Sequence, residues 1–369
     1  MKGLKTIKQC SQEVADKLGL IRKSLTEIGA AAVRLRGTDW FAWATAGGEN
    51  TVLLAAETGI AEVLIAMDGA WVLTDYIEAQ RLSDEELPAN YQLYVNPWAE
   101  SGDREQFVRE VTRGGQILSD RPVKGELPLP KSLMFHKRVL IATELDRYRE
   151  VGRLASEAMT EVLLAAQPTW TEYQLAGAGA EALWARGLHP TLTLVAGERR
   201  LPLYRHATAS GEPLGREAML VFCARGYGLY ANLTRFVCFG GLGSDRAQLH
   251  QQVREIEAEA LAASQPGTAL STVYQRLADA YQQRGYPQAI REHHQGGTTG
   301  YLSREVVATP STTEELAGNM AIAWNPSLPG AKIEDTFATA GGALENLTCD
   351  RNWPSVTVAG RSRPLPLER

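Results

Sequence analysis

The sequence has few cysteines, no long apolar run and no excess of positive charge, and each shortage excludes a class of protein. Its four cysteines (Cys10, Cys223, Cys238 and Cys349) are scattered and form no C-x-x-C pair, which favours a reducing cytoplasm over a disulfide framework. No apolar stretch reaches the roughly 18 residues of a membrane span, and the opening MKGLKTIKQCSQEVADKLGL lacks the apolar core of a signal peptide. The net charge is −5, so nothing indicates binding to nucleic acid or to an anionic membrane.

The bulk composition is that of an ordinary globular chain. Hydrophobic residues make up 44% of the 369 residues and charged residues 22%, the usual balance for a soluble protein. At roughly 150 residues per domain, this length predicts about two domains. We find no short-period repeat and no low-complexity segment.

The first part of the chain predicts a helix followed by short strands. Residues 12–28 carry apolar side chains at three- and four-residue spacing, which is typical of a helix. Turn signals such as Gly47-Gly48 separate the apolar runs that follow. These runs cover residues 31–35, 51–56, 61–67 and 70–74. The proline-bearing segment 120–138 is interpreted as a linker, so we expect an α/β domain over residues 1–136.

The second part predicts strong helices between strand-like runs. Thr143-Glu-Leu-Asp146 and Thr169-Trp-Thr-Glu172 fit the capping-box pattern, and each precedes a helical periodicity. Two more helices are expected at 245–264 and 270–284. The strand-like runs cover residues 191–196, 219–224, 230–239, 320–324 and 332–340. Strands interrupted by helix pairs favour an antiparallel sheet covered by helices.

Five segments of this second part carry a family resemblance. They are TELDRYREVGRLASEAMTEVLLAAQPTWTE, YRHATASGEPL, MLVFCARGYGLYANLTRFVCFG, EHHQGGTTGY and NMAIAWNPSLPGAKIEDTFATAGGALENLT. In order and spacing they resemble the creatinase/prolidase/aminopeptidase P superfamily, and five motifs in sequence favour a common fold. The resemblance implies an α+β chain: a creatinase-like N-terminal α/β domain over 1–136, then a pita-bread domain over 137–369 with a curved antiparallel sheet covered by helices.

The resemblance also shows what the site has lost. Metallopeptidases of the superfamily hold two divalent metals with four carboxylates and one histidine, because carboxylates neutralise and bridge two close cations. The matching positions here are Cys223, Asn232, His294, Asn325 and Glu334. With one carboxylate instead of four, the repulsion between two dications is uncompensated. We therefore predict no metal and no other cofactor, and leave open one metal on Cys223, His294 and Glu334.

Several replacements keep a polar pocket. The connection from Cys223 to Asn232 is two residues shorter than the family's usual turn, and this even change allows both side chains to face the same side. The family's second histidine becomes Tyr301. Lys332 stands two residues before Glu334, so on a strand both point to one face. Arg235 fills the family's Thr-Arg position. The candidate substrate contacts are Cys223, Asn232, Arg235, Tyr301, Asn325 and Lys332.

Each candidate has a structural alternative. His206 matches a histidine that handles protons in the family, and in creatinase, which works without metal, the equivalent histidine is the acid–base group; otherwise it is a surface-loop residue. His294 is a second catalytic candidate, with a structural hydrogen bond as its alternative and His293 as the alternative ring. Glu334 is the third candidate, and its alternative is an ion pair with Lys332 or Arg235.

Two further residues carry the same ambiguity. Cys223 is either a nucleophile activated by a histidine or an inert buried thiol. Arg235 is either a substrate contact or part of a structural salt bridge.

The prediction is a metal-independent hydrolase or lyase that cleaves a C–N bond in a small polar substrate, similar in logic to creatinase. The first alternative is an inactive pseudo-peptidase that serves as a binding module. The second is an Xaa-Pro-type aminopeptidase or dipeptidase with unusual ligands. The expected partners are a small molecule or short peptide and, from the resemblance, a second copy of the chain in a homodimer.

Overall fold

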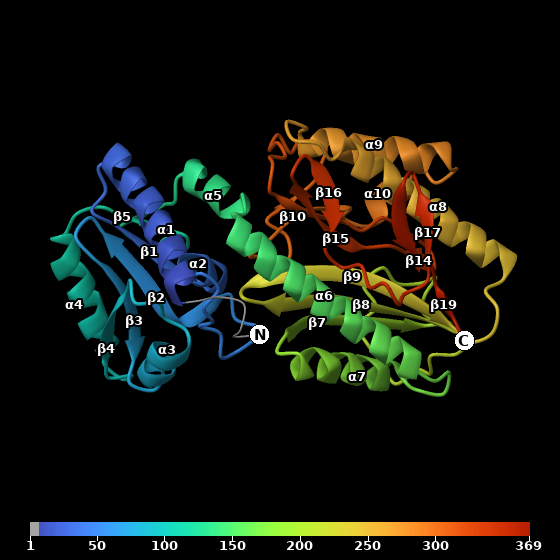
Figure 1. Cartoon of the computed structure of the whole chain (residues 1–369), viewed down its shortest axis with the longest axis horizontal. Helices are drawn as coiled ribbons and strands as arrows, with labels where there is room; N and C mark the ends of the chain where they lie inside the picture. The colour runs from blue at the N-terminus through green and yellow to red at the C-terminus, as the bar shows by residue number, and fades with distance from the viewer. Residues whose placement is uncertain (1–6) are drawn as a thin grey trace. The chain divides into compact units, whose positions relative to one another are not determined.

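The computed structural model describes residues 7–369, and Figure 1 shows the whole chain. It divides into two compact units after Lys137, next to the boundary expected after residue 136. Each unit has its own sheets and its own core. Within residues 7–369, no helix combines the length and the apolar character needed to cross a membrane.

The N-terminal unit is built on one six-stranded mixed sheet with the order β4-β3-β2-β1-β5-β6. Its strands are β1 (Ala32–Gly37), β2 (Thr58–Ala66), β3 (Ala70–Asp75), β4 (Gln92–Asn96), β5 (Ile117–Ser119) and β6 (Glu126–Pro128). Its helices are α1 (Ile7–Ile28), α2 (Thr38–Ala44), α3 (Ala79–Glu85), α4 (Ser101–Thr112) and α5 (Lys131–Arg138), the last of which contains the boundary.

Two predictions for this unit are wrong. The apolar run 51–56 forms no strand, because β2 and β5 already occupy both edges of β1, and Val52 and Leu53 are left exposed. The segment 120–138 is not a plain linker, since it contains β6 and α5. Pro128 ends the edge strand β6, where a missing N–H is tolerated. Pro130 directly precedes α5, and its carbonyl accepts from the Leu133 N–H at 3.0 Å.

In the N-terminal unit, two arginines form ion pairs and two tryptophans pack in the core. Arg34 binds Glu62 and Glu105 at 2.5 and 2.6 Å, and Arg36 binds Glu126 at 2.6 Å. These arginines are therefore committed to ion pairs within the unit. Trp40 and Trp43 are buried in the core, as ordinary packing requires.

The C-terminal unit is built on two sheets, β19-β9-β8-β7 and β11-β10-β12-β15-β16. The first uses β7 (His189–Gly197), β8 (Glu217–Gly226), β9 (Leu229–Cys238) and β19 (Leu367–Glu368). The second uses β10 (Gly296–Thr299), β11 (Val306–Val307), β12 (Ala321–Trp324), β15 (Asp335–Ala340) and β16 (Ala343–Asn346). Two small hairpins complete it: β13 (Ser327–Leu328) with β14 (Ala331–Lys332), and β17 (Ser355–Val358) with β18 (Arg361–Pro364).

Helices cover both sheets of this unit, as predicted (Figure 1). The helices are α6 (Ala142–Ala165), α7 (Glu172–Ala185), α8 (Ser244–Ala263), α9 (Leu270–Gln283) and α10 (Ala289–Glu292). One core joins α6 and α7 to β7, β8 and β9. A second core joins α8 and α9 to β12 and β15. The pairings are antiparallel, except that the short β19 runs parallel to β9.

The predicted capping box at α7 is displaced along the chain, and at α6 only half of one forms, because the side chain of Ile141 at the N-cap has no acceptor. At α6 the Glu144 carboxylate accepts from the Ile141 N–H at 2.9 Å, so the cap lies before Thr143. At α7 the Thr171 hydroxyl accepts from the Gln174 N–H at 3.2 Å, and Gln174 returns a bond to the Thr171 N–H at 2.8 Å. In both cases the bond to the N-cap N–H forms where the chain turns into the helix, two residues from the expected position at α7.

A buried ion-pair network ties the C-terminal hairpin to the rest of its unit. Arg363 on β18 binds the Glu257 carboxylate with two hydrogen bonds of 2.7 and 2.6 Å. The same guanidinium reaches Asp335 at 2.8 Å, and Asp335 also accepts from Arg235 at 2.7 Å. All four groups are buried, so removing one leaves uncompensated charge in the interior.

We expect Arg363→Met to lower the free energy of unfolding by about 3–5 kcal/mol, because it strips Glu257 of its bidentate partner and Asp335 of one of two. The measurement is urea denaturation followed by circular dichroism. Arg361→Met, two residues away on the same strand at a partly exposed position, is the matched control and should change little. Equal effects of the two substitutions would contradict a special role for the network.

Candidate active site

The hairpin of β8 and β9 places two of the predicted residues side by side. Cys223 pairs directly with Asn232, and the strands close at Gly226 and Leu229. The two-residue turn, Tyr227-Gly228, has φ values of 53° and 78°, which is the pattern of a type I′ turn. The shortened connection therefore keeps both side chains on one face, as the even change in length predicted.

Glu334 and Asn325 meet this hairpin where the two sheets join. Glu334 forms an isolated bridge with Thr234 of β9, and its carbonyl accepts from the Thr234 N–H at 3.0 Å. Trp324 pairs with Asp335, so Asn325 follows directly on the strand beside Glu334. The Asn325 N–H in turn donates to the Gln295 carbonyl at 3.1 Å, next to the histidine segment. All five predicted positions thus gather at one junction.

The Glu334 carboxylate is held by two cations. Arg304 Nη2 lies 2.5 Å from one oxygen, and Lys332 Nζ lies 3.4 Å from the other. Burial alone would raise the pKa of Glu334, but the charges of Lys332 and Arg304 outweigh it and lower this pKa to about 2. Glu334 is therefore a fixed negative charge with both oxygens occupied, and its ion pair with Lys332 is the structural alternative that the sequence left open.

Arg304 is a site residue that sequence reasoning missed. It lies in the loop between β10 and β11, and its Nη1 also donates to the Ser303 carbonyl at 2.6 Å. The sequence offered one indication of this contact, an arginine close after the glycine-rich segment Gly296-Gly297 and a carboxylate, Glu334, expected in the site. Which loop cation folds back onto which acid depends on long-range packing, and periodicity does not reveal it.

The two asparagines each keep one buried acceptor in reserve. Asn232 donates from Nδ2 to the Thr299 hydroxyl at 3.0 Å and to the Ser303 carbonyl at 3.4 Å. Within the described residues, the Oδ1 atoms of Asn232 and Asn325 are buried and have no hydrogen-bond partner. A buried acceptor without a partner is unusual in a folded protein and is typical of a ligand site. These oxygens suit N–H donors of a bound molecule.

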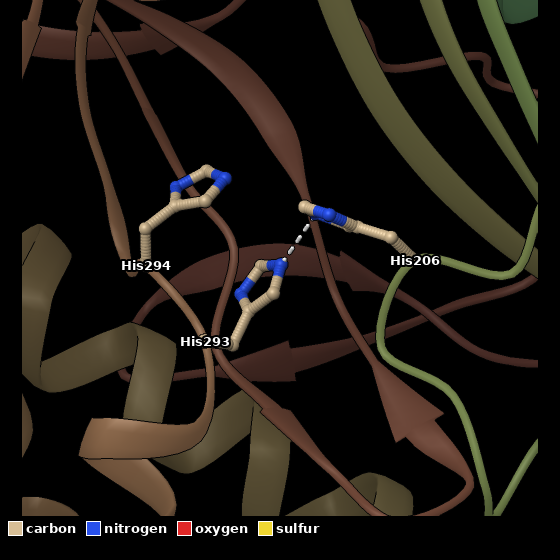
Figure 2. A group of neighbouring side chains, drawn as sticks. All are labelled: His206, His293 and His294. Atoms are coloured by element: carbon tan, nitrogen blue, oxygen red, sulfur yellow. Dashed lines mark hydrogen bonds between the residues drawn. The ribbon is translucent and has the colours of Figure 1, made fainter.

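Three histidines converge beside this junction (Figure 2). His206 lies in the loop after β7, whereas His293 and His294 follow α10. Nε2 of His206 and Nε2 of His293 are 2.9 Å apart, and the ring of His293 stacks on that of His294 with centroids 4.5 Å apart. His206 and His294 were the predicted pair, but His293, the alternative ring, makes the hydrogen bond.

The surroundings keep all three imidazoles neutral near pH 7. Partial burial, together with the positive charge of Lys332, lowers the pKa of His206 and lowers that of His293 to about 2. Partial burial and Arg304 lower the pKa of His294 to about 4. In the hydrogen bond between His206 and His293, one neutral ring donates and the other accepts. The hydrogen bond therefore fixes the tautomers of the two rings relative to each other.

Two contacts fix the segments that carry these rings. Arg205 and Glu292, the residues directly before His206 and His293, form an ion pair with each other. The Gln295 side chain donates to the His293 carbonyl at 2.6 Å. The loop after β7 and the segment after α10 are therefore joined next to the rings themselves, which limits how far the imidazoles can separate.

Two predicted substrate contacts are engaged elsewhere in the unit. The Tyr301 side chain is fully buried, and its hydroxyl donates to Glu144 on α6 at 2.7 Å. Arg235 donates to Asp335 at 2.7 Å and to the Thr348 carbonyl at 2.9 Å. The structure thus places Arg235 in the buried ion-pair network, which is its structural alternative.

Comparison with known proteins gives this arrangement a family. Two joined sheets covered by helices, with polar groups at the junction, define a hydrolase-like pita-bread domain. The sequence profile of metallopeptidase family M24 matches residues 146–340, and the chain belongs to that family of hydrolases. A search of curated protein sequences gives no match.

Solved structures share the fold across nearly the whole chain. The X-Pro aminopeptidase from Thermotoga maritima MSB8 matches with a TM-score of 0.75 and 17% identity, over 90% of this chain and 97% of that one. The prolidase from Pyrococcus horikoshii OT3 matches with a TM-score of 0.75 and 15% identity, over 91% and 99%. The N-terminal domain of FACT complex subunit SPT16 from Cicer arietinum matches with a TM-score of 0.68 and 12% identity, over 94% and 96%. The predicted fold is confirmed.

The residues at the junction do not fit the two-metal centre of the family. Glu334 is the only carboxylate among the five matching positions, and Arg304 and Lys332 occupy its oxygens. Asn232 turns its amide nitrogen, which is no ligand, toward Thr299. A pair of dications would have to displace the side-chain cations Arg304 and Lys332. The two dications would then be neutralised by the single negative charge of Glu334, which is electrostatically unfavourable.

Cys223 is expected to be inert toward alkylation. Burial, with a smaller effect of Glu334, raises the pKa of the Cys223 thiol to about 12, so almost no thiolate exists at pH 8. In native protein treated with iodoacetamide, mass spectrometry should find the exposed Cys349 modified well before Cys223. In Cys349→Ser protein, Cys223 should still react only slowly with iodoacetamide. Fast alkylation of Cys223 would instead support its role as a nucleophile.

We expect Arg304→Met to lower the free energy of unfolding by about 1.5–3 kcal/mol at pH 7, the range for a hydrogen bond to a charged group. The folded pKa of Glu334, about 2, lies below its ordinary 4.5. The stabilisation is therefore present above pH 4.5 and is lost as the pH falls toward 2. The deficit of the variant should shrink over that window in urea titrations. Arg351→Met, in an exposed turn, is the control, and a pH-independent deficit would contradict the assignment.

Proposed function

We propose that the chain is a hydrolase that cleaves a C–N bond in a small polar molecule without the two-metal centre of its family. The observation that carries the proposal is the hydrogen-bonded pair of neutral imidazoles, His206 and His293, beside a buried carboxylate held by two cations. Fixed side-chain charges replace the metal charges at the junction, and imidazoles supply the proton chemistry. This logic resembles that of creatinase.

The proton chemistry needs one group that accepts and then returns a proton. In the proposed reaction, water attacks the carbon of the C–N bond and gives its proton to a ring nitrogen of His206, while His293 fixes the orientation of that ring through their hydrogen bond. The C–N bond then breaks, and the same proton passes to the leaving nitrogen. His294, stacked on His293, orients the water. Positioned acid–base groups of this kind contribute about 10²- to 10⁴-fold to a rate.

The junction supports a substrate that is rich in N–H donors. The free Oδ1 atoms of Asn232 and Asn325 accept those donors. Lys332 and Arg304 together carry one more positive charge than Glu334 neutralises, so the pocket stabilises negative charge that develops on the attacked group or pairs with a substrate carboxylate. Glu334 acts through these two cations. Guanidino, ureido and amide compounds combine these features.

Two further parts of the proposal, a cytoplasmic location and a homodimer, come from the sequence. The scattered cysteines favour a cytoplasmic location. The family resemblance favours a homodimer. Neither is required by the proposed chemistry, which uses residues of one unit only.

The second candidate function is a binding module that retains the fold without chemistry. The saturation of Glu334 by Arg304 and Lys332 favours it, because a carboxylate so engaged performs no acid–base work itself. The similarity to the N-terminal domain of a FACT complex subunit is a likeness of fold. An Xaa-Pro peptidase, the activity named for several similar structures, is disfavoured by the loss of the metal-binding carboxylates.

The test is a screen of chelator-treated, full-length protein against guanidino, ureido, amide and Xaa-Pro peptide substrates, followed by detection of released amine or ammonia. We expect turnover of a member of the first three groups, and we expect His206→Ala to lower kcat by about 10²- to 10⁴-fold. His136→Ala, in the exposed part of α5, is the matched control and should keep full activity. Turnover of proline peptides only, and only with added metal, would falsify the proposal. No turnover at all would favour the binding module.

A further inference from the structure

The three histidines bring their ring nitrogens together more closely than the proposed reaction requires. The reaction uses the hydrogen bond between His206 and His293, whereas His294 also brings a ring nitrogen into the same space (Figure 2). One nitrogen from each ring lies within 4.8 Å of the other two. The buried Nδ1 of His293 has no hydrogen-bond partner within the described residues. Three converging imidazoles with lone pairs to spare are a recognised arrangement for a metal ion.

The spacing suits one small ion. Histidine nitrogens bind zinc at about 2.0–2.1 Å, so two nitrogens on a tetrahedral ion lie roughly 3.3 Å apart. The separation of 2.9 Å between His206 and His293 and the outer limit of 4.8 Å bracket this value. Small ring rotations therefore bring three nitrogens onto one ion. The ion pair of Arg205 with Glu292 already holds the two segments together, which reduces the entropy lost on binding.

The ligand set selects the class of metal. Three imidazoles without a carboxylate suit zinc, cobalt or nickel, whereas magnesium and calcium require oxygen ligands. The charges nearby weaken the site, because Lys332 and Arg304 oppose a dication and only Glu334 attracts it. The ion is therefore held less tightly than at a three-histidine site with acidic neighbours.

We propose that His206, His293 and His294 together bind one zinc-like divalent ion, and that this ion reversibly inhibits the reaction. The inhibition rests on the proposed function: an ion bound to His206 and His293 breaks the hydrogen bond between the rings and takes a lone pair that His206 needs to accept the proton from water. This site shares only His294 with the five positions that match the family's two-metal centre, and it uses none of Cys223, Asn232, Asn325 or Glu334. It also differs from the single-metal alternative on Cys223, His294 and Glu334.

Binding is measured without substrate, by titration of chelator-stripped, full-length protein with cobalt(II) in visible spectroscopy and with zinc in calorimetry. We expect one ion per chain and a cobalt spectrum of low-coordinate type. Alanine at any one of the three histidines should weaken binding by at least about tenfold, whereas His136→Ala should leave it unchanged. Magnesium and calcium should not bind.

Cys223→Ser separates the two possible places for the ion. On the three-histidine site this substitution leaves the affinity for the ion unchanged, and His206→Ala weakens it by at least about tenfold. Were the ion on Cys223, His294 and Glu334 instead, Cys223→Ser would weaken binding, His206→Ala would not, and cobalt would show a thiolate charge-transfer band. That pattern, or no binding at all, overturns the proposal.

Inhibition is tested on the substrate found in the screen. We expect activity to fall in proportion to zinc occupancy and to return with chelator. Stimulation by zinc would overturn the inhibitory role. Binding of one ion to a protein that turns over no substrate would keep the three-histidine site and remove the hydrolase, so the two proposals fail separately.

Discussion

The site depends on how one buried negative charge is balanced. Glu334 lies at the junction of the two sheets, where a carboxylate without partners would take up a proton. Arg304 and Lys332 keep it ionised, so side chains of the same unit neutralise the one carboxylate among the five matching positions. Cys223, Asn232 and Asn325 carry no formal negative charge, so the two cations have no second carboxylate to balance at these positions.

The same short segment also organises the core behind the site. Glu334 and Asp335 are neighbours, and their side chains point to opposite faces, as successive residues of a strand do. The first meets Arg304 and Lys332, whereas the second meets Arg235 and Arg363. The backbone of Glu334 bonds to Thr234 of the other sheet. The junction is thus built on a buried framework, which suits a site whose groups must keep fixed positions.

The sequence predicted those parts of the structure that follow from local periodicity. Strand parity placed Cys223 beside Asn232 and Lys332 beside Glu334, because alternation along a strand has a period of two. It failed where long-range packing decides. The apolar run 51–56 has strand-like residues but no free sheet edge, and Arg304 sits in a loop whose path no pattern encodes. The choice between His293 and His294 depends on the exact loop conformation, which a glycine-rich segment leaves open.

The ion pair of Arg205 and Glu292 joins the two segments of the histidine cluster at the surface of the unit. Glu292 is half exposed, with 49% of its side chain accessible, and His206 and His294 are exposed as well. An ion pair that faces solvent is partly screened by salt. We therefore expect high ionic strength to loosen the link between the two segments, through a contact that touches neither the rings nor any bound molecule.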